Sequence, residues 1–365
     1  MIERIHIENF KSIYNLDIEV SRVNLFIGEN GSGKSNLLEA LVFVSAAQSN
    51  KLDNEFLSSR GLRVTEPTLM RSAFNKENEN INIKISIGQK NDLANYEFTN
   101  NNTVYSKWER VLGSDEEEVK LLISENKPKS KSLIQKYFND RYSQIGMQNF
   151  LIYSPENTAL RTFEKGGQIQ PLGINGEGLL KLLKVVNHYE DKSYINTIIE
   201  SLQLFDWFED IKIPSDLSYG EDKVIITDKY LYQEIDQRST NEGFLFILFY
   251  ITLIVAKETP KAFAIDNIDA SLNPKLCTKL MLIINDLAKK YDKQVFLTTH
   301  NPAILDGINL NDKEQKLFVV SRNKSGHTRM KNITAENKPK SSNDEPLKLS
   351  EAFLRGYLGG LPKGF

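Results

Sequence analysis

Residues 28–35 read Gly28-Glu29-Asn30-Gly31-Ser32-Gly33-Lys34-Ser35 and match the phosphate-binding pattern G-x-x-x-x-G-K-[ST] at every constrained position. The preceding residues 23–27 are apolar and β-prone, and residues 36–42 have the apolar spacing of a helix. A strand, a glycine loop and a helix in this order direct backbone N–H groups and the positive helix end toward an anion. A chance glycine turn is the alternative, but agreement of both flanks favours a nucleotide-binding loop.

The loop residues have expected roles toward ATP. Lys34 is expected to reach the β- and γ-phosphates, and Ser35 to place its hydroxyl on Mg²⁺. The other loop residues and Asn36, at the start of the helix, are predicted to surround the phosphates. ATP and Mg²⁺ are therefore the expected ligands.

The composition excludes several classes of protein. The chain has 365 residues, 40% of them hydrophobic, with a net charge of −2 and a single cysteine, Cys277. This length predicts one large domain with a subdomain, the charge excludes a globally basic protein, and the single cysteine excludes a disulfide framework. The N-terminus lacks the apolar core of a signal peptide, and the longest apolar run, 243–256, is too short to span a bilayer. We expect a soluble, cytoplasmic protein without a membrane partner.

Strands alternate with helices along much of the chain, which predicts an α/β fold with a mostly parallel core sheet covered on both faces. Short apolar segments at 150–153, 262–265, 295–298 and 316–320 are predicted strands. Segments 177–188, 192–208, 243–256 and 275–290 are predicted helices. The periodicity weakens and the polarity rises between residues 49 and 147. We therefore predict an N-terminal lobe (1–48), an inserted arm subdomain (49–147), the remainder of the domain (148–325) and a tail with a final helix (326–365).

Two polar residues follow neighbouring predicted strands. Asp266 closes the strand 262–265, where an unpaired carboxylate would be costly unless a cation or donors receive it. It is predicted to hold Mg²⁺ together with Ser35, and the alternative is an ordinary helix-capping role. His300 follows the strand 295–298, where it can contact the γ-phosphate or polarise the attacking water. Both are candidate catalytic residues.

These motifs together resemble ABC-type ATPase heads, and most closely the SMC-like, overcoming-lysogenization-defect (OLD)-like and RecF-like members. The resemblance rests on residues 28–35, on Asp266-Asn267-Ile268-Asp269-Ala270-Ser271-Leu272-Asn273-Pro274, on Thr298-Thr299-His300-Asn301-Pro302 and on Phe10-Lys11-Ser12. It covers about residues 1–48 and 148–325 and implies a P-loop head. It also implies a dimer in which ATP lies between the P-loop of one subunit and a signature motif of the other.

Two stretches resemble the signature motif. Leu217-Ser218-Tyr219-Gly220-Glu221 looks like the family's L-S-G-G-E, but a predicted strand follows it. Asn241-Glu242-Gly243 instead opens the apolar helix 243–256, and its spacing to Asp266 suits one helix and a return turn. We prefer Asn241, Glu242 and Gly243 as the ATP-contacting stretch, with Asn241 where the family usually has serine.

The sequence departs from the family pattern at two positions. Asn267 stands where ABC-type heads usually carry a glutamate that acts as general base, and an amide cannot accept a proton at neutral pH. Hydrolysis should therefore be slow unless His300 or Asp269 compensates. The glutamine expected after the strand 150–153 is also missing. Ser154, Glu156 and Asn157 are the candidates to replace it, and the sequence does not choose among them.

Two functions follow from the resemblance. The first is an ATP-gated dimeric switch that hydrolyses ATP slowly and controls a separate effector protein, as stand-alone heads do in anti-phage defence systems. The second is a RecF-like ATPase of DNA repair or recombination. Basic patches at 60–63, 127–131 and 338–340 would serve DNA binding, although such patches are usually plain solvated surface.

Overall fold

The computed structural model describes residues 1–103, 106–112, 124, 133, 146–163, 166–214, 223–339 and 347–360. Its centre is a six-stranded sheet with the order β14-β13-β3-β12-β11-β7. Five of its strands are parallel, namely β3 (Val23–Gly28), β7 (Ile152–Tyr153), β11 (Ala262–Ile265), β12 (Gln294–Thr299) and β13 (Gln315–Arg322). The last strand, β14 (Thr328–Ile333), runs antiparallel to β13. The predicted mostly parallel core sheet is therefore confirmed.

The core strands are buried on both faces, as their apolar runs predict. Every residue of β3, β11 and β12 is buried. One face of the sheet packs against α1 (Lys34–Gln48), and the other against α9 (Glu242–Val255) and α10 (Pro274–Lys290). The side chains alternate between two hydrophobic clusters, so that Leu25 belongs to the α9 side and Phe26 to the α1 side.

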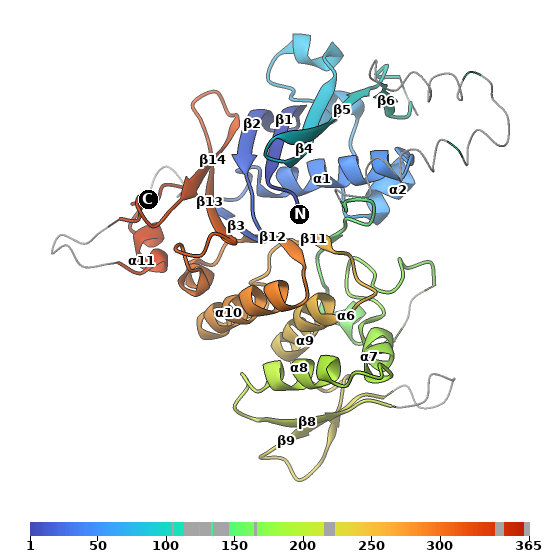
Figure 1. Ribbon diagram of the computed structural model, residues 1–365, viewed down its shortest axis with the longest axis vertical. Coiled ribbons are helices and arrows are strands. Elements are labelled where there is room, and N and C mark those ends of the chain that lie inside the picture. The colour runs from blue at the N-terminus through green and yellow to red at the C-terminus, as the bar shows by residue number, and fades with distance from the viewer. Residues whose placement is uncertain are drawn as a thin grey trace.

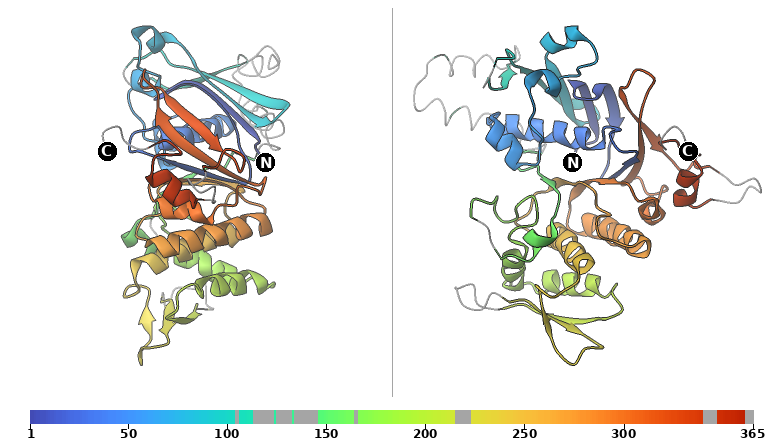
Figure 2. Two further views of the ribbon diagram at one scale, coloured as in Figure 1. Left: turned by 90° about the vertical axis from the view of Figure 1, so that its left-hand side faces the viewer. Right: turned by 180° about the vertical axis from the view of Figure 1, so that it is seen from behind.

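A second sheet covers α1 on its far side (Figure 2). It is antiparallel, with the order β2-β1-β4-β5-β6. Its strands are β1 (Arg4–Phe10), β2 (Ile13–Glu19), β4 (Ile83–Gln89), β5 (Asp92–Thr99) and β6 (Glu109–Val111). The described part of segment 49–147 therefore shares a sheet with the N-terminal strands, through the pairing of β1 with β4. The expected boundaries at residues 48 and 147 remain predictions.

The opposite side of the core sheet carries a mainly helical layer. Residues 244–255 of α9 are all buried, which explains why this helix is apolar nearly all round. The neighbours of α9 include α6 (Asn157–Leu160), α7 (Leu179–Asn187), α8 (Ser193–Leu202) and α10. A small sheet of β8 (Phe208–Lys212), β9 (Ile225–Asp228) and β10 (Ile235–Asp236) lies at the far end of this layer (Figure 1). Among the described residues, no helix has both the length and the apolar character required to cross a bilayer.

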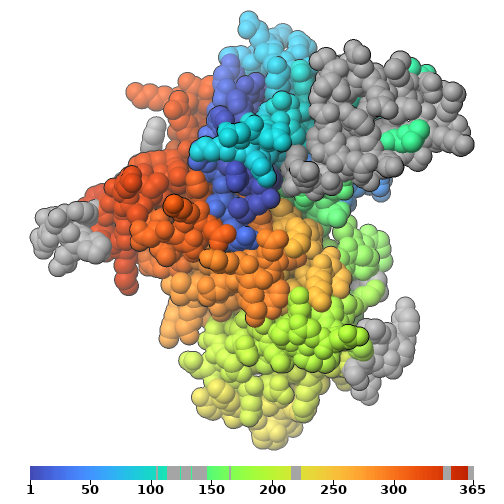
Figure 3. Space-filling view, in the orientation of Figure 1, coloured from blue at the N-terminus to red at the C-terminus, as the bar shows by residue number. Residues whose placement is uncertain are grey.

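Short elements complete the described chain. They are α2 (Asn54–Ser59), α3 (Pro67–Met70), η1 (Lys76–Asn80), η4 (Pro302–Gly307) and α11 (Leu349–Leu354). The C-terminal strands lie against the N-terminal ones on one face of the molecule (Figure 3), where the N–H of Thr328 donates to the carbonyl of Ser12 at 2.8 Å. The segment 326–365, expected as a tail, thus contributes β14 to the core sheet.

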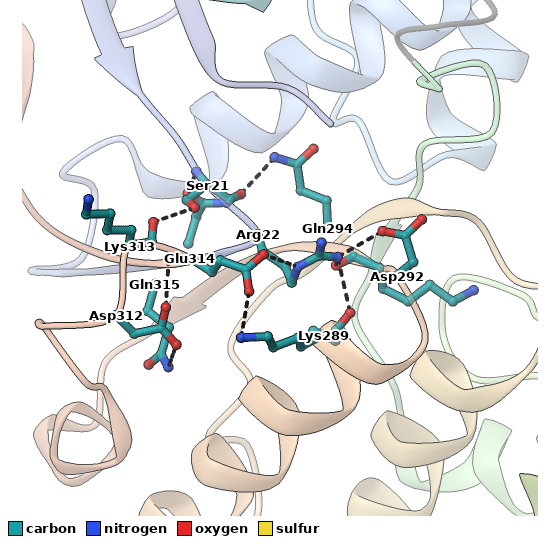
Figure 4. A network of polar contacts seen from close by, with 12 residues as sticks. Ser21, Arg22, Lys289, Asp292, Gln294, Asp312, Lys313, Glu314 and Gln315 are labelled. Carbon is teal, nitrogen blue, oxygen red and sulfur yellow. Dashed lines mark hydrogen bonds and ion pairs between the residues drawn. The ribbon is translucent and has the colours of Figure 1, made fainter. Parts of the chain in front are cut away.

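A network of charges closes the amino edge of the core sheet (Figure 4). The Arg22 guanidinium donates to Glu314 at 2.9 Å and to Asp292 at 3.1 Å, and Lys289 contacts Glu314 at 3.3 Å. These contacts join the entry to β3, the end of α10 and the entry to β13. The opposite, carboxyl edge of the same strands carries the polar residues predicted from the sequence.

Candidate functional site

The predicted phosphate loop lies between β3 and α1. Gly33 caps α1 with a φ of 106°, in the left-handed region that favours glycine. A Cβ at Gly33 would lie 2.1 Å from Oγ1 of Thr328, whereas one at Gly31 would meet no atom within 4 Å. The loop therefore packs closely against Thr328 at Gly33 and leaves open space at Gly31. An anion-binding loop requires such open space on one side.

Lys34 lies folded over this loop. Its Nζ donates to the carbonyl oxygens of Gly28 at 2.9 Å and Glu29 at 3.1 Å, and it lies 3.5 Å from Nδ1 of His300. Burial lowers the pKa of Lys34 to about 8, although the charges of Asp266 and two other carboxylates partly oppose this shift. Phosphate oxygens close to Nζ would stabilise the ammonium form of Lys34. The environment of Lys34 is therefore suited to binding an anionic ligand.

The two predicted magnesium ligands lie together at the carboxyl edge. The Ser35 hydroxyl donates to Oδ2 of Asp266 at 3.0 Å. The Thr298 hydroxyl also donates to the Asp266 carboxylate, and it accepts from the N–H of Asn267 at 2.9 Å. Hydroxyl and carboxylate oxygens are the ligands Mg²⁺ prefers, together with phosphate oxygens and water. Asp266 is thus held by donors and oriented toward the loop.

One orphaned polar atom tests whether ATP fits. The Ser32 hydroxyl is buried and has no hydrogen-bond partner in the part of the chain that the structure describes. A buried hydroxyl in this state is costly, and a phosphate oxygen in the loop would supply the missing partner. The residues present therefore fit a Mg²⁺-bound triphosphate.

The candidate catalytic residues surround the same point. Asn267 is exposed and has a φ of 55°. Oδ1 of Asp269 accepts from Oγ1 of Thr299 at 2.6 Å and from the N–H of His300 at 3.3 Å, so this oxygen orients the His300 loop. Burial and the charge of Lys34 lower the pKa of His300. A neutral imidazole at pH 7 can orient a water molecule without carrying a charge.

The stretch preferred for the signature opens α9 as expected. Asn241 caps the helix, and its Oδ1 accepts from the N–H of Phe244 at 2.8 Å. Oε1 of Glu242 accepts from Oγ of Ser271 at 2.5 Å, and a Cβ at Gly243 would lie 3.2 Å from the Ser271 carbonyl. The helix start thus packs on the loop that follows Asp266. The competing stretch 217–221 lies outside the described residues.

The three candidates for the missing glutamine lie just after β7. The backbone N–H groups of Ser154 and Glu156 donate to the carbonyls of Ile174 and Asn175, both at 2.8 Å, and their side chains are exposed. Asn157 begins α6, and its side-chain oxygen accepts from Arg161. Among the described residues, none of the three forms a hydrogen bond with Ser35 or Asp266, and their role remains a prediction.

A basic cavity of about 400 Å³ adjoins the loop. Its lining includes Lys11, Ser12, Asn36, Arg63, Phe74 and Arg322. Lys11 and Arg63 both pair with the buried carboxylate of Glu39 on α1. The cavity lies beside the start of α1, next to the predicted phosphate loop.

Several residues that shape the loop had no role predicted from the sequence. Arg322 donates to the Gly31 carbonyl at 2.7 Å, and Oγ1 of Thr328 donates to the Ser32 carbonyl at 2.9 Å. Both come from the hairpin β13–β14 and lack a local motif. Glu39 is a buried glutamate in the largely apolar helix α1. A carboxylate at such a position indicates cationic partners, which here are Lys11 and Arg63.

The chain is similar to several known proteins. The model of the family described as "AAA domain, putative AbiEii toxin, Type IV TA system" matches residues 23–306. The DNA replication and repair protein RecF of Listeria monocytogenes is 33% identical over 96 residues, which is 26% of this chain and 25% of that one. RecF of Lactobacillus acidophilus is 24% identical over 229 residues, covering 56% of this chain and 58% of that one. The chain thus spans between about a quarter and three fifths of these relatives.

Solved structures show the fold. The SMC head bound to the C-terminal winged-helix domain of ScpA has a TM-score of 0.58 at 15% identity, covering 92% of this chain and 98% of that chain. The SMC head domain from Thermotoga maritima has a TM-score of 0.50 at 14% identity, covering 92% and 99%. The predicted fold class, an α/β P-loop head of the ABC type, and the resemblance to SMC-like and RecF-like ATPases are confirmed.

Proposed function

The chain belongs to the AAA-domain family of the putative AbiEii toxin type, and on this premise we propose that it is an ATP-gated dimeric switch. It binds ATP with Mg²⁺, dimerises around the nucleotide, hydrolyses it slowly and controls a separate effector protein. Membership of the SMC- and RecF-like ATPases supports the nucleotide chemistry. The remaining steps are proposals drawn from the site.

The observation that carries this proposal is the pairing of Ser35 with Asp266 beneath Lys34. A hydroxyl and a carboxylate 3.0 Å apart form one side of a Mg²⁺ site, and the ammonium lies over the loop that would hold the phosphates. Bound Mg²⁺ would neutralise charge on the β- and γ-phosphates. The protein groups bind and orient the triphosphate, and the unpaired Ser32 hydroxyl gains a partner.

Slow hydrolysis follows from the residue beside Asp266. Asn267 offers an amide where a proton acceptor would speed the attack of water. Oδ1 of Asp269 accepts from Thr299 and from the His300 backbone, and we propose that the His300 imidazole orients the water. Orientation without proton transfer gives a low rate, and a low rate keeps the ATP-bound state long-lived.

Dimerisation is supported by the accessible start of α9. Asn241 is exposed and the next two residues are half-buried, so the first turn of this 14-residue helix reaches the surface. The positive end of a helix favours a γ-phosphate supplied by another subunit. We propose that Asn241, Glu242 and Gly243 contact the ATP of the partner subunit.

The effector and the biological setting rest on the family. Its description names a toxin of a toxin–antitoxin system, which agrees with a switch that acts on another protein, and we propose a role in anti-phage defence. The second candidate is RecF-like DNA binding, favoured by the RecF relatives. A DNA mobility shift that requires ATP and weakens with salt would support DNA binding. Co-purification with the product of a neighbouring gene would support the effector.

Light scattering with size-exclusion chromatography tests the switch. Wild-type protein should dimerise with Mg·ATP and remain monomeric with Mg·ADP. Asp266→Ala should weaken Mg²⁺-dependent ATP binding and leave the fold intact, because Asp266 is half-buried and lies at the end of its strand. Equal Mg²⁺ sensitivity of ATP binding in the variant and the wild type would show that Asp266 is structural.

A further inference from the structure

We propose that Arg161 is a positioning residue that fixes the start of α9 relative to the sheet edge that carries the ATP site. The inference rests on the proposed function, because the start of α9 is the stretch expected to meet the partner subunit's ATP. Arg161 follows α6 directly and has no role in the predicted site. Its side chain makes hydrogen bonds to α6 and to the segment before α9.

The Arg161 guanidinium forms hydrogen bonds with two segments, the adjacent helix α6 and the distant residues 237–240. Within α6, Nε donates to Oδ1 of Asn157 at 2.9 Å. Nη1 donates to the carbonyl oxygens of Gln237 at 2.8 Å and Arg238 at 2.6 Å, and Nη2 donates to that of Thr240 at 2.8 Å. Because the guanidinium is planar and its donors have fixed directions, these bonds set the three carbonyls relative to α6.

We call the hydrogen bonds of Arg161 to Asn157 and to residues 237–240 the Arg161 clamp. The segment 237–240 leads directly into α9. Residues 237–240 connect β10 to Asn241, the cap of α9. Gln237 and Thr240 are only 1% and 2% exposed, so their carbonyls need partners within the protein. Arg161 supplies these partners, and in doing so it fixes the residue from which the helix departs.

The other end of the Arg161 clamp, Asn157 in α6, is connected through β7 to the predicted magnesium site. The N–H of Asp266 donates to the carbonyl of Tyr153 at 2.9 Å, at the end of β7. Three residues then separate Tyr153 from Asn157, the first residue of α6. A shift of the loop 154–156 is therefore transmitted through α6 and Arg161 to the start of α9. The Glu242–Ser271 hydrogen bond gives α9 a second, independent link to the loop after Asp266.

The experiment separates nucleotide affinity from the assembly of the dimer. Arg161→Ala should leave the Mg·ATP affinity of the protomer, measured by titration calorimetry, at the wild-type value. ATP-dependent dimerisation should weaken about tenfold or more, since several charged hydrogen bonds that orient α9 are lost. Arg161→Lys, which keeps the charge but not the fork of donors, should give a smaller loss. Arg355→Ala, which removes an exposed arginine just after α11, is the charge-matched control.

Hydrogen exchange provides a readout that does not depend on dimerisation. In nucleotide-free protein, peptides covering 241–247 should exchange faster in Arg161→Ala than in the wild type, while peptides from α10 stay unchanged. Unchanged exchange at 241–247, or an equal loss of ATP affinity and dimerisation, would overturn the inference. Absence of any ATP-dependent dimer of the wild type would instead refute the proposed switch, and exchange would still test Arg161.

Discussion

Asn267→Glu should raise the steady-state ATPase rate, because it places a carboxylate beside the water that attacks the γ-phosphate. A positioned general base contributes about 10²–10⁴-fold. This corresponds to about 2.7–5.4 kcal/mol of activation free energy. If His300 already orients the water, the gain lies at the lower end of this range.

The backbone at this position sets the limit on that gain. Asn267 has a φ of 55°, and its N–H is held by Oγ1 of Thr298 at 2.9 Å. Asparagine and aspartate tolerate this left-handed conformation, whereas glutamate costs about 1–2 kcal/mol there. Asn267→Glu should therefore lower the free energy of unfolding by about that amount. Asn267→Asp supplies a carboxylate without this cost, but its side chain is one methylene shorter.

Phosphate release at saturating Mg·ATP, measured over a range of protein concentrations, is the assay. Asn267→Gln is the matched control, because it has the length of glutamate and the same backbone cost but cannot accept a proton. We expect it to hydrolyse ATP no faster than the wild type, and we expect His300→Ala to remove most of the wild-type rate. Fast wild-type turnover that does not respond to Asn267→Glu would refute the reasoning and assign the base to another residue.

Lys34→Ala should abolish ATP binding in calorimetry, because the cation facing the β- and γ-phosphates is lost, and unchanged affinity would contradict the loop assignment. Gly33→Ala should lower the unfolding free energy by about 2–4 kcal/mol, since the added methyl group would lie 2.1 Å from Oγ1 of Thr328. A wild-type melting curve for that variant would count against the loop geometry. Arg22→Ala should cost about 1–3 kcal/mol at pH 7 in denaturant titrations. Arg22 lowers the pKa values of its two carboxylate partners, so their stabilisation is full above the ordinary values of 3.8 and 4.5 and is lost as the pH falls through the lowered ones. A variant with the same loss of stability in acid as the wild type would argue against this network.

The phosphate loop, Asp266 and His300 could be predicted because each lies within a short motif next to a buried strand. Parallel strands bring their carboxyl ends to one edge, so spacing alone places these residues together. The predicted helix 192–208 shows where such reasoning fails. α8 ends at Leu202, because Phe205, Trp207 and Phe208 pack on Phe244 of α9, and Phe208 begins a strand instead.

The rest of the site depends on contacts between distant segments. Thr328 and Arg322 reach the loop from the hairpin β13–β14, and no periodicity or motif marks them. Arg161 likewise contacts carbonyls 76 to 79 positions away. Backbone carbonyls carry no residue identity, so a side chain that binds them leaves no trace in the sequence of its partner segment.

The close packing of Thr328 against Gly33 has a consequence for synthesis of the chain. Its hydroxyl bonds to a loop residue 296 positions earlier. At an elongation rate of about 5–20 residues per second, the ribosome takes roughly 15–60 s to cover that distance. For that interval the nascent chain has its glycine loop but lacks one side of the cradle, so the ATP site is completed only after β14 has been synthesised. A molecule that can close around ATP is thus one whose core sheet has already received β14.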